Sequence, residues 1–314
     1  MEKVLVTGGA GFIGSHIVEA LQQNQYEVIV IDNFSTGHHR NIADLSVNVH
    51  KCDITNPEVI NLIASIKPDY IIHQAAQVSV AESVQNILFD EQVNVKGSLH
   101  VIKGAIRASV KKIVFASSAA VYGNPIELPI TTKHRTLPES PYGLTKLTVE
   151  HYLQMASKFY QLPYAILRYS NVYGPRQDAK GEGGVVSIFA DYISNQLSPT
   201  IFGDGEQTRD FIFVKDVATA NVKALQAEEN ICVNVSSGST ITINELFTIM
   251  KKVANTKLNA TYSEARSGDI RDSCLSNEET KAILGWSPSV NLFNGLFETI
   301  EYASKRNALE KIII

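Results

Sequence analysis

The sequence predicts an α/β protein, with a doubly wound parallel sheet followed by a smaller, mixed α/β lobe. Two observations predict this class. Short apolar runs alternate with helical patterns through the first half of the 314 residues, which is typical of parallel crossover units. The runs are also apolar throughout instead of alternating with polar residues. Such runs indicate strands in a sheet that helices cover on both faces.

The first half of the chain supplies the elements of the expected sheet. Strands are expected at residues 4–7, 27–32, 47–53, 70–73, 112–117 and 164–169. Helices are expected at residues 13–23, 57–65, 91–108 and 142–159. Each helix lies between two strands, so each can carry the chain back across the sheet.

The pattern changes after Gly174, where glycine, proline and polar residues become frequent. A short strand at 211–214 and a helix at 216–226 indicate a return to the larger domain. We therefore expect residues 1–174 to form that domain, with a returning segment near 206–230. The smaller lobe is expected to take residues 175–205 and 231–314.

Composition narrows the possible partners. The formal net charge is -4, and no basic cluster predicts a nucleic-acid or polybasic membrane surface. No apolar run approaches the ~20 residues that a membrane-spanning helix needs. Cys52, Cys232 and Cys274 are scattered and odd in number, as expected for reduced thiols in a cytosolic protein. We expect a cytoplasmic protein without nucleic-acid, membrane or metal partners.

A glycine-rich turn joins the first strand to the first helix. Gly8 permits a tight turn, Gly11 lets the backbone approach a pyrophosphate, and Gly14 lets helix and strand pack closely. The N-terminus of the following helix offers unpaired N–H groups and the positive end of its dipole. This strand–turn–helix context favours a Rossmann-type dinucleotide site over an ordinary glycine turn.

Asp32 ends the second expected strand and bears on the choice of cofactor. A carboxylate there accepts hydrogen bonds from the adenosine ribose and repels the 2′-phosphate of NADP. We therefore expect NAD. Two alternatives remain, because Asp32 could simply form a turn, and Arg40 lies close enough in sequence to accommodate NADP.

Tyr142 and Lys146 are four residues apart at the start of an expected helix, so their side chains share one face. A lysine cation favours the phenolate of a nearby tyrosine, which lets the tyrosine act as a base. Ser118 follows an expected strand, at the carboxyl edge where ligands bind in open α/β sheets. An ordinary surface pair is the alternative, but the dinucleotide turn favours a catalytic set of Ser118, Tyr142 and Lys146.

Several motifs together resemble those of the extended short-chain dehydrogenases/reductases, in the branch of nucleotide-sugar epimerases. The resemblance runs over nearly the whole chain, from Thr7 to the stretch 284–288. Besides the glycine turn, the matching stretches are 52–54, 73–77, 94–97, 117–123, 141–146 and 168–171.

This resemblance implies NAD as cofactor and a role for each matching residue. Asp53 and Ile54 would hold the adenine, Lys146 the nicotinamide ribose, and Asn94 would brace neighbouring loops. Simple loop packing is the alternative for Asn94 and Ala75. The implied cofactor set is Gly8, Gly11, Phe12, Ile13, Gly14, Asp32, Asn33, Ser35, Thr36, Gly37, Asp53, Ile54, Gln74, Ala75, Ala76, Gln77, Asn94, Tyr142, Lys146 and Tyr169.

The residues after Ser118 indicate which reaction follows the first oxidation. Family members that eliminate water carry Thr-Asp-Glu at the strand end, and decarboxylating members carry a Glu two residues after the Ser or Thr. Here Ala119 and Ala120 occupy these positions, and a methyl group transfers no proton. Epimerisation at carbon 4 of a UDP-sugar is therefore expected, unless an acid comes from elsewhere in the chain.

The resemblance also implies residues that bind the sugar nucleotide. Arg209 and Arg266 would pair with the diphosphate, since a guanidinium can bind two phosphate oxygens at once. Ser273 would flank the substituent at carbon 2, where a small residue admits an N-acetyl group. The implied substrate set is Ser118, Asn171, Arg209, Arg266, Asp269 and Ser273.

Several alternatives remain open at this stage. The substrate can be a UDP-hexose, a UDP-N-acetylhexosamine, a UDP-uronic acid or another nucleotide sugar. A net 4-reductase would need nicotinamide to exchange at each turnover. A non-catalytic NAD-binding protein would not need the Ser–Tyr–Lys set.

A homodimer is expected, as in similar proteins, through the helices at 91–108 and 142–159. Val95, Leu99, Ile102 and Ile106 recur at helical spacing on the first of these helices. The alternative is that this apolar stripe faces the sheet.

Overall fold

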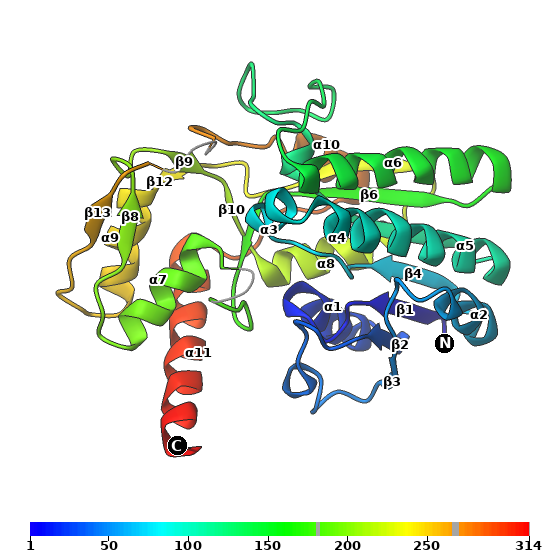
Figure 1. The fold of residues 1–314 in the computed structure, drawn as a ribbon, viewed down its shortest axis with the longest axis horizontal. Coiled ribbons are helices and arrows are strands. Elements are labelled where there is room, and N and C mark those ends of the chain that lie inside the picture. Colours follow the sequence, from blue (N-terminus) through cyan, green and yellow to red (C-terminus); the bar gives the residue numbers. More distant parts are fainter. Residues whose placement is uncertain (180–182, 266–269, 314) are drawn as a thin grey trace.

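A seven-stranded parallel sheet organises the larger domain of this computed structural model, which describes residues 1–179, 183–265 and 270–313 (Figure 1). The spatial order of the strands is β11-β6-β5-β4-β1-β2-β3, and every neighbouring pair is parallel. The strands are β1 Lys3–Thr7, β2 Glu27–Asp32, β3 Asn48–Lys51, β4 Tyr70–His73, β5 Lys112–Ser118, β6 Tyr164–Tyr169 and β11 Ile231–Val235. The predicted fold class is confirmed.

Helices cover both faces of this sheet. Along β1, Leu5 faces one core, whereas Val4 and Val6 face the other. The first core lies under α2 Glu58–Ile66, α5 Ser98–Ala108 and α6 Pro141–Tyr160. The second lies under α1 Phe12–Gln23, α8 Val214–Leu225 and α10 Glu278–Leu284. Burial on both faces explains why the strands are apolar throughout.

The strand order reverses between β1 and β4, which defines the ligand-binding crevice of an open α/β sheet. Short elements surround the carboxyl ends of these strands. They are the 3₁₀ turns His39–Asn41 and Ala119–Val121, the helices α3 Val80–Gln85 and α4 Ile87–Glu91, and the π-helix Gln92–Gly97. One helix was expected over residues 91–108. The structure instead has a π-helix that continues into α5, and α3 and α4 were not expected.

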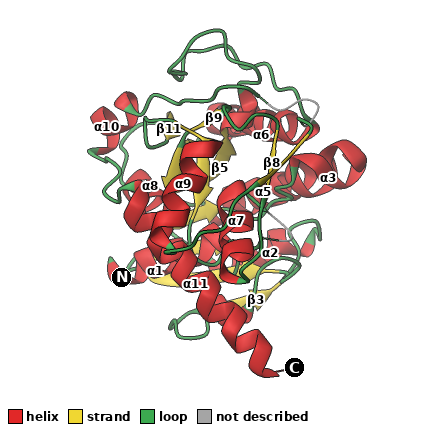
Figure 2. Cartoon of the chain, turned by 90° about the vertical axis from the view of Figure 1, so that its left-hand side faces the viewer, coloured by secondary structure: helices red, strands yellow, loops and turns green. Residues whose placement is uncertain are grey.

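A smaller lobe packs beside the carboxyl edge (Figure 2). Its helices α7 Val185–Ser194, α9 Ile243–Val253 and α11 Leu292–Ile313 share an aromatic and aliphatic core with Phe189 and Phe247 in edge contact. Three two-stranded sheets complete it and its junction with the larger domain. They pair β8 Thr200–Phe202 with β13 Thr261–Ser263, β9 Thr208–Arg209 with β12 Ile241–Thr242, and β7 Asn171–Tyr173 with β10 Phe211–Phe213.

The chain returns to the larger domain further along than the sequence analysis expected. Residues from 231 onward were assigned to the small lobe, but β11 pairs with β6 in the central sheet. Leu284 and Trp286 also pack into the core beneath α8. The expected domain boundary at residue 231 is therefore wrong. The prediction failed because the local sequence of a strand does not show which distant strand it pairs with. No helix in the described ranges is long and apolar enough to cross a membrane.

Candidate active site

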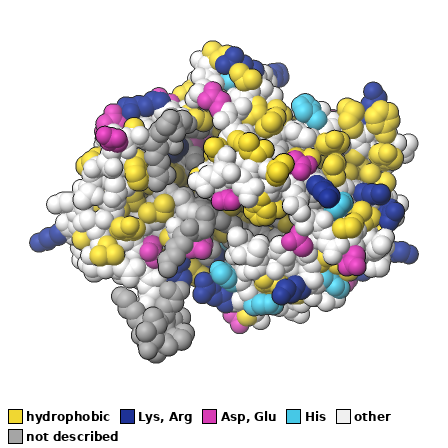
Figure 3. Space-filling model, in the orientation of Figure 1, with side chains coloured by type: hydrophobic (Ala, Val, Ile, Leu, Met, Phe, Trp, Pro, Cys, Tyr) yellow, Lys and Arg dark blue, Asp and Glu magenta, His cyan; other side chains and the backbone are white. Residues whose placement is uncertain are grey.

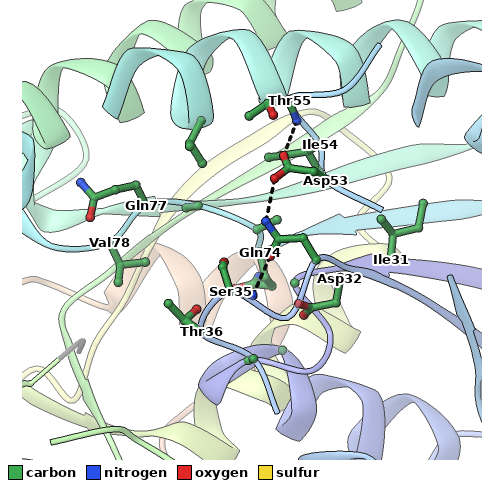
Figure 4. Close-up of a pocket in the computed structure, with 18 of the residues that line it drawn as sticks. Ile31, Asp32, Ser35, Thr36, Asp53, Ile54, Thr55, Gln74, Gln77 and Val78 are labelled. Carbon is green, nitrogen blue, oxygen red and sulfur yellow. Dashed lines mark hydrogen bonds between the residues drawn. The ribbon is translucent and has the colours of Figure 1, made fainter. Parts of the chain in front are cut away.

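A cleft of about 660 Å³ lies over the carboxyl ends of β1, β2 and β4 (Figure 4). It has one wall at Ile31, with Gln77 and Val78 on the opposite side. Most of the predicted cofactor residues line it: Gly8, Gly11, Phe12, Ile13, Gly14, Asp32, Asn33, Ser35, Thr36, Gly37, Asp53, Ile54, Gln74, Ala75, Ala76 and Gln77. Asn94, Tyr142, Lys146 and Tyr169 are not among the residues that line it.

The glycine turn is shaped for close approach by a ligand. Gly8 has φ +68°, and a Cβ there would lie 2.7 Å from the backbone nitrogen of Ala75. A Cβ on Gly14 would overlap the carbonyl oxygen of Gly8. The N-cap residue Gly11 offers no side chain to the first turn of α1, and that turn holds no acidic residue. Its N–H groups and dipole therefore fit the pyrophosphate of a dinucleotide.

Asp32 is buried at the end of β2 and holds the neighbouring loops. Its Oδ2 accepts a hydrogen bond from the Ala10 N–H at 2.9 Å, and its Oδ1 accepts one from the Phe34 N–H at 2.8 Å. Each oxygen of a carboxylate has two lone pairs, so each retains one for a ribose hydroxyl. Negative charge at this position fits NAD better than NADP.

Asp53 lines the cleft beside Thr55 (Figure 4) and accepts hydrogen bonds from Asn33 and Thr55. Burial acts to raise its pKa, but hydrogen bonds from Thr55 and Asn33 outweigh burial and lower it. The Asn33 amide donates at 2.8 Å and the Thr55 N–H at 2.8 Å. The ionised carboxylate is therefore fixed as a hydrogen-bond acceptor beside Ile54.

The cleft also has a wall that the sequence analysis missed. Its residues come from the segment just before α3 and from α3, α4 and the π-helix. They are Val78, Ser79, Glu82, Phe89, Gln92 and Val93. One sequence signal for α3 was available. Ser79 caps this helix by accepting from the Glu82 N–H, and Ser followed three residues later by Glu is an N-terminal helix signature.

Asn94 lies behind the cleft and braces it. Its Oδ1 accepts from the Gln77 N–H at 2.9 Å, and its Nδ2 donates to the Gln77 carbonyl at 2.9 Å. These two bonds fix the backbone of the residue that lines the cleft. Asn94 itself sits in the π-helix, an irregularity frequently found at functional sites.

The three predicted catalytic residues lie on β5 and on the first turns of α6, which pack together at the carboxyl edge of β5. Ser118 ends this strand, and its Oγ accepts from the Ala120 N–H at 3.2 Å. Ser140 caps α6 and Pro141 begins it, so Tyr142 lies in the first turn. The Lys146 Nζ lies 5.7 Å from the centre of the Tyr142 ring.

Lys146 is buried under the site. Its Nζ donates to the Ala116 carbonyl at 3.0 Å and lies 5.0 Å from the centre of the Phe115 ring. Burial lowers the pKa of Lys146 to about 8, and the nearby carboxylate of Asp90 acts to raise it. Near neutral pH, neighbouring charges therefore influence whether Lys146 is protonated.

Tyr169 connects the cleft to this set. It lies opposite Ser118 in the register of β5 and β6, and its hydroxyl accepts from the Gln74 amide at 3.0 Å. Burial raises the pKa of Tyr169, and the proximity of Tyr142 adds to the effect. Tyr169 is thus a neutral phenol, which makes it a hydrogen-bonding group and not a base.

A buried ion pair links the helix and strands at the carboxyl edge of β5. The Arg168 guanidinium donates to both oxygens of Glu150, at 2.9 and 2.6 Å. The Ser117 hydroxyl also donates to Glu150, at 2.5 Å, and the Arg168 NH1 group donates to the Tyr122 hydroxyl at 3.0 Å. This network ties α6 to β5 and β6, one residue before Ser118.

Besides Ser118 and Ser273, four residues were predicted to bind the substrate. Arg266 and Asp269 lie outside the described residues. Asn171 begins β7, and its Nδ2 donates to the Asp210 carbonyl at 3.2 Å. Arg209 ends β9, donates to the Thr208 carbonyl at 2.8 Å, and lines a second cavity of about 360 Å³ together with Phe211.

The register around Ser273 is fixed by its two neighbours. The Thr208 hydroxyl donates to Asp272 at 2.7 Å, and the Ile130 N–H donates to the Cys274 carbonyl at 2.8 Å. Asp272 is therefore held against β9. Ser273 is half-buried and lies between two residues whose positions these hydrogen bonds fix. Among the described residues, no group of three His, Cys, Asp or Glu is placed to hold a metal ion.

A parallel sheet with a dinucleotide turn, an acidic residue at the end of β2, a serine at the end of β5 and a Tyr–Lys pair at the start of α6 defines an extended short-chain dehydrogenase/reductase. Similarity to known proteins narrows this class to one family. The chain belongs to the NAD dependent epimerase/dehydratase family, whose sequence profile matches residues 4–236. It is an NAD-dependent enzyme, as the sequence predicted.

Three relatives match along nearly their whole length. UDP-glucose 4-epimerase of Mycolicibacterium smegmatis is 38% identical over 96% of this chain and 98% of its own. The crystal structure of the Thermotoga maritima UDP-glucose 4-epimerase with UDP-glucose has a TM-score of 0.94 and 41% identity, covering 98% and 99%. UDP-N-acetylglucosamine 4-epimerase of Methanobrevibacter ruminantium, in complex with UDP-N-acetylmuramic acid, has a TM-score of 0.92 and 36% identity, covering 97% and 99%.

Proposed function

We propose that this protein is an NAD-dependent 4-epimerase of a UDP-sugar. The observation that carries the proposal is that Tyr142 and Lys146 lie together in the first turns of α6, packed beside the end of β5 where Ser118 stands, next to a cleft with the shape and charge for NAD. The full-length similarity to 4-epimerases of UDP-glucose and of UDP-N-acetylglucosamine supports it. The glycine turn, Asp32 and Asp53 would hold the dinucleotide.

Tyr142 is the proposed proton carrier. Its phenolate would remove the proton of the sugar 4-hydroxyl, and Ser118 would hydrogen-bond the same oxygen. Lys146, still protonated, would stabilise the phenolate through its positive charge. NAD, when bound, supplies the hydride acceptor and returns the hydride. The keto sugar turns between these two transfers, and Tyr142 then gives the proton back.

The surroundings of Ser118 favour epimerisation over elimination. Ala119 and Ala120 follow it in a 3₁₀ turn and carry no group that can transfer a proton. With no acid or base at this place, the keto sugar has no partner for loss of water or of carbon dioxide there. Return of the hydride to the opposite face remains.

Ser273 is the proposed determinant of substrate breadth. It is small, half-buried and fixed between the anchored residues Asp272 and Cys274. A small side chain leaves room for an N-acetyl group at carbon 2, which a large aromatic side chain would fill. We therefore propose that the enzyme accepts UDP-N-acetylglucosamine as well as UDP-glucose.

We also propose a homodimer, but through other side chains than the sequence analysis named. Leu99, Ile102 and Ile106 pack into the core under the sheet, so the alternative explanation of this apolar stripe holds for them. Exposed apolar side chains gather instead on α3, α4 and α6. Figure 3 shows this face of the molecule, which is rich in hydrophobic groups. They are Val80, Val84, Ile87, Leu88, Leu144, Tyr152, Met155 and Phe159. Such a patch on a soluble enzyme marks an interaction surface.

A cytoplasmic location completes the proposal and is supported by three free cysteines. The test of function is a panel of UDP-glucose, UDP-N-acetylglucosamine and UDP-glucuronate, with product sugars separated by chromatography and no reductant added. We expect interconversion of 4-epimers of the first two. Turnover of UDP-glucuronate alone would point to a uronic-acid epimerase. NAD binding without turnover of any of them would point to a non-catalytic protein.

A further inference from the structure

Asp90 is a fully buried carboxylate on the inner side of α4. Its Oδ1 accepts from the Gln77 Nε2 at 2.8 Å and from the Asn94 Nδ2 at 2.9 Å. Its Oδ2 accepts from the Thr145 hydroxyl at 3.0 Å. The three donors come from the segment after β4, from the π-helix and from α6, so one carboxylate joins the wall of the cofactor cleft to the helix that carries Tyr142.

All three donors are neutral, which is unusual for a buried charge. Taking a carboxylate out of water is costly unless a cation compensates it. The hydrogen-bond partners of the Asp90 carboxylate in the described part of the chain are these neutral donors, with no lysine, arginine or histidine among them. A compensating charge must therefore act from somewhat further away.

The cation on which the charge of Asp90 acts is Lys146. It is buried, it follows Thr145 directly in the chain, and its own hydrogen bond goes to a neutral carbonyl at Ala116. The carboxylate of Asp90 acts to raise the pKa of Lys146 against the lowering by burial. Two buried groups of opposite charge thus share one region without a direct ion pair.

The other titratable groups described around Lys146 do not supply the negative charge that acts on it. On β4, burial lowers the pKa of His73 to about 3, so its ring is neutral between Thr7 and Ser98. On α6, Tyr142 is the reacting group itself. One turn beyond Lys146, Glu150 is bound at both oxygens by Arg168.

We propose that Asp90 is a positioning residue for the epimerase reaction. Through Thr145 its carboxylate fixes the first turn of α6, and through its charge it keeps Lys146 protonated beside Tyr142. This inference rests on the proposed function. The Thr145 hydroxyl has one proton to donate, and its oxygen lies 3.0 Å from Asp90 and 2.9 Å from the Tyr142 carbonyl, so Thr145 stands between the carboxylate and the reacting residue.

The two effects of Asp90 predict different losses. Removing its negative charge makes proton loss from Lys146 easier, so Lys146 deprotonates at lower pH. The alkaline limb of the activity profile, where Lys146 loses its proton, then moves to lower pH. Removing only the Thr145 hydroxyl leaves the charge in place but frees the first turn, which lowers kcat.

The experiment compares three variants of the NAD-loaded enzyme with wild type, by kcat and KM for the UDP-sugar across pH. In Asp90→Asn the alkaline limb should move down by roughly one pH unit, the scale of one nearby charge. Thr145→Val should lose roughly tenfold in kcat at unchanged KM, and Thr145→Ser should restore it. The matched control is Glu91→Gln, which removes an exposed charge from the same helix and should leave the profile unchanged.

A second readout does not depend on turnover. The ultraviolet absorbance of the Tyr142 phenolate, taken as the difference from Tyr142→Phe, should titrate at a different pH in Asp90→Asn than in wild type, because the charges of Asp90 and of Lys146 both act on it. An Asp90→Asn enzyme with the wild-type profile and the wild-type phenolate titration overturns the proposal. Should this variant fail to fold, the Thr145 pair decides, and a Thr145→Val enzyme with wild-type kcat overturns it. If wild type epimerises no UDP-sugar, the proposed function fails, while the phenolate titration still tests Asp90.

Discussion

The buried pair of Arg168 and Glu150 allows a stability prediction in which the sign and the size both follow from burial. Their side chains are 8% and 1% exposed, and the guanidinium binds both carboxylate oxygens. Replacing Arg168 by Met leaves Glu150 buried without a cation. Breaking a buried pair from one side costs about 3–5 kcal/mol.

The loss can be converted into a shift of the unfolding temperature. Unfolding entropy is about 2.1 cal/mol/K per residue, so a chain of 314 residues should lose roughly 5–8 °C in Tm. The deficit should shrink as pH falls, because the stranded Glu150 takes up a proton more readily in the folded than in the unfolded chain. It should be largest near pH 7.

The assay is thermal unfolding by circular dichroism at one fixed, saturating NAD concentration, since bound cofactor itself raises Tm. Arg168→Met combined with Glu150→Leu should recover most of the loss, because an apolar pair needs no charge compensation. Lys281→Met, which breaks the exposed pair with Glu278, is the control and should change stability by about 0.5 kcal/mol or less. The reasoning is refuted if Arg168→Met matches this control at pH 7, or if its deficit persists in the double variant.

Four further outcomes are expected. Tyr142→Phe should lower turnover by about 10² or more while NAD stays bound, and near wild-type turnover would remove Tyr142 from its role. Asp32→Ala should weaken the preference for NAD over NADP in calorimetric titration; tighter NADP binding by wild type would contradict this. Ser273→Tyr should selectively suppress turnover of UDP-N-acetylglucosamine, by about 5- to 150-fold if overpacking costs about 1–3 kcal/mol, and equal loss of UDP-glucose turnover would count against a gate. Leu88→Asp should convert a dimer into a monomer in light scattering, and a monomeric wild type would dispose of the interface.

Local patterns were enough to predict much of the sheet. The bounds of β2, β4 and β6 agree with the sequence analysis residue for residue, because each is a continuous apolar run between polar or helical stretches. The cofactor cleft could be predicted as readily, since its glycine turn begins directly after β1 and Asp32 ends β2. Helices α3 and α4 were missed because they are short and their apolar residues face outward, which hides the periodicity of a buried face.

The sequence by itself determined the doubly wound sheet, the dinucleotide turn and the shared helix face of Tyr142 and Lys146. These features depend on periodicity and on neighbours within a few residues, so they are written locally. Only the tertiary structure decided that β11 enters the central sheet, that the apolar stripe on α5 faces inward, and that Asp90 meets Thr145 across 55 residues of chain. Such contacts join distant segments whose local sequences are compatible with several partners. Packing and the satisfaction of buried polar groups select among them, and both are properties of the whole fold.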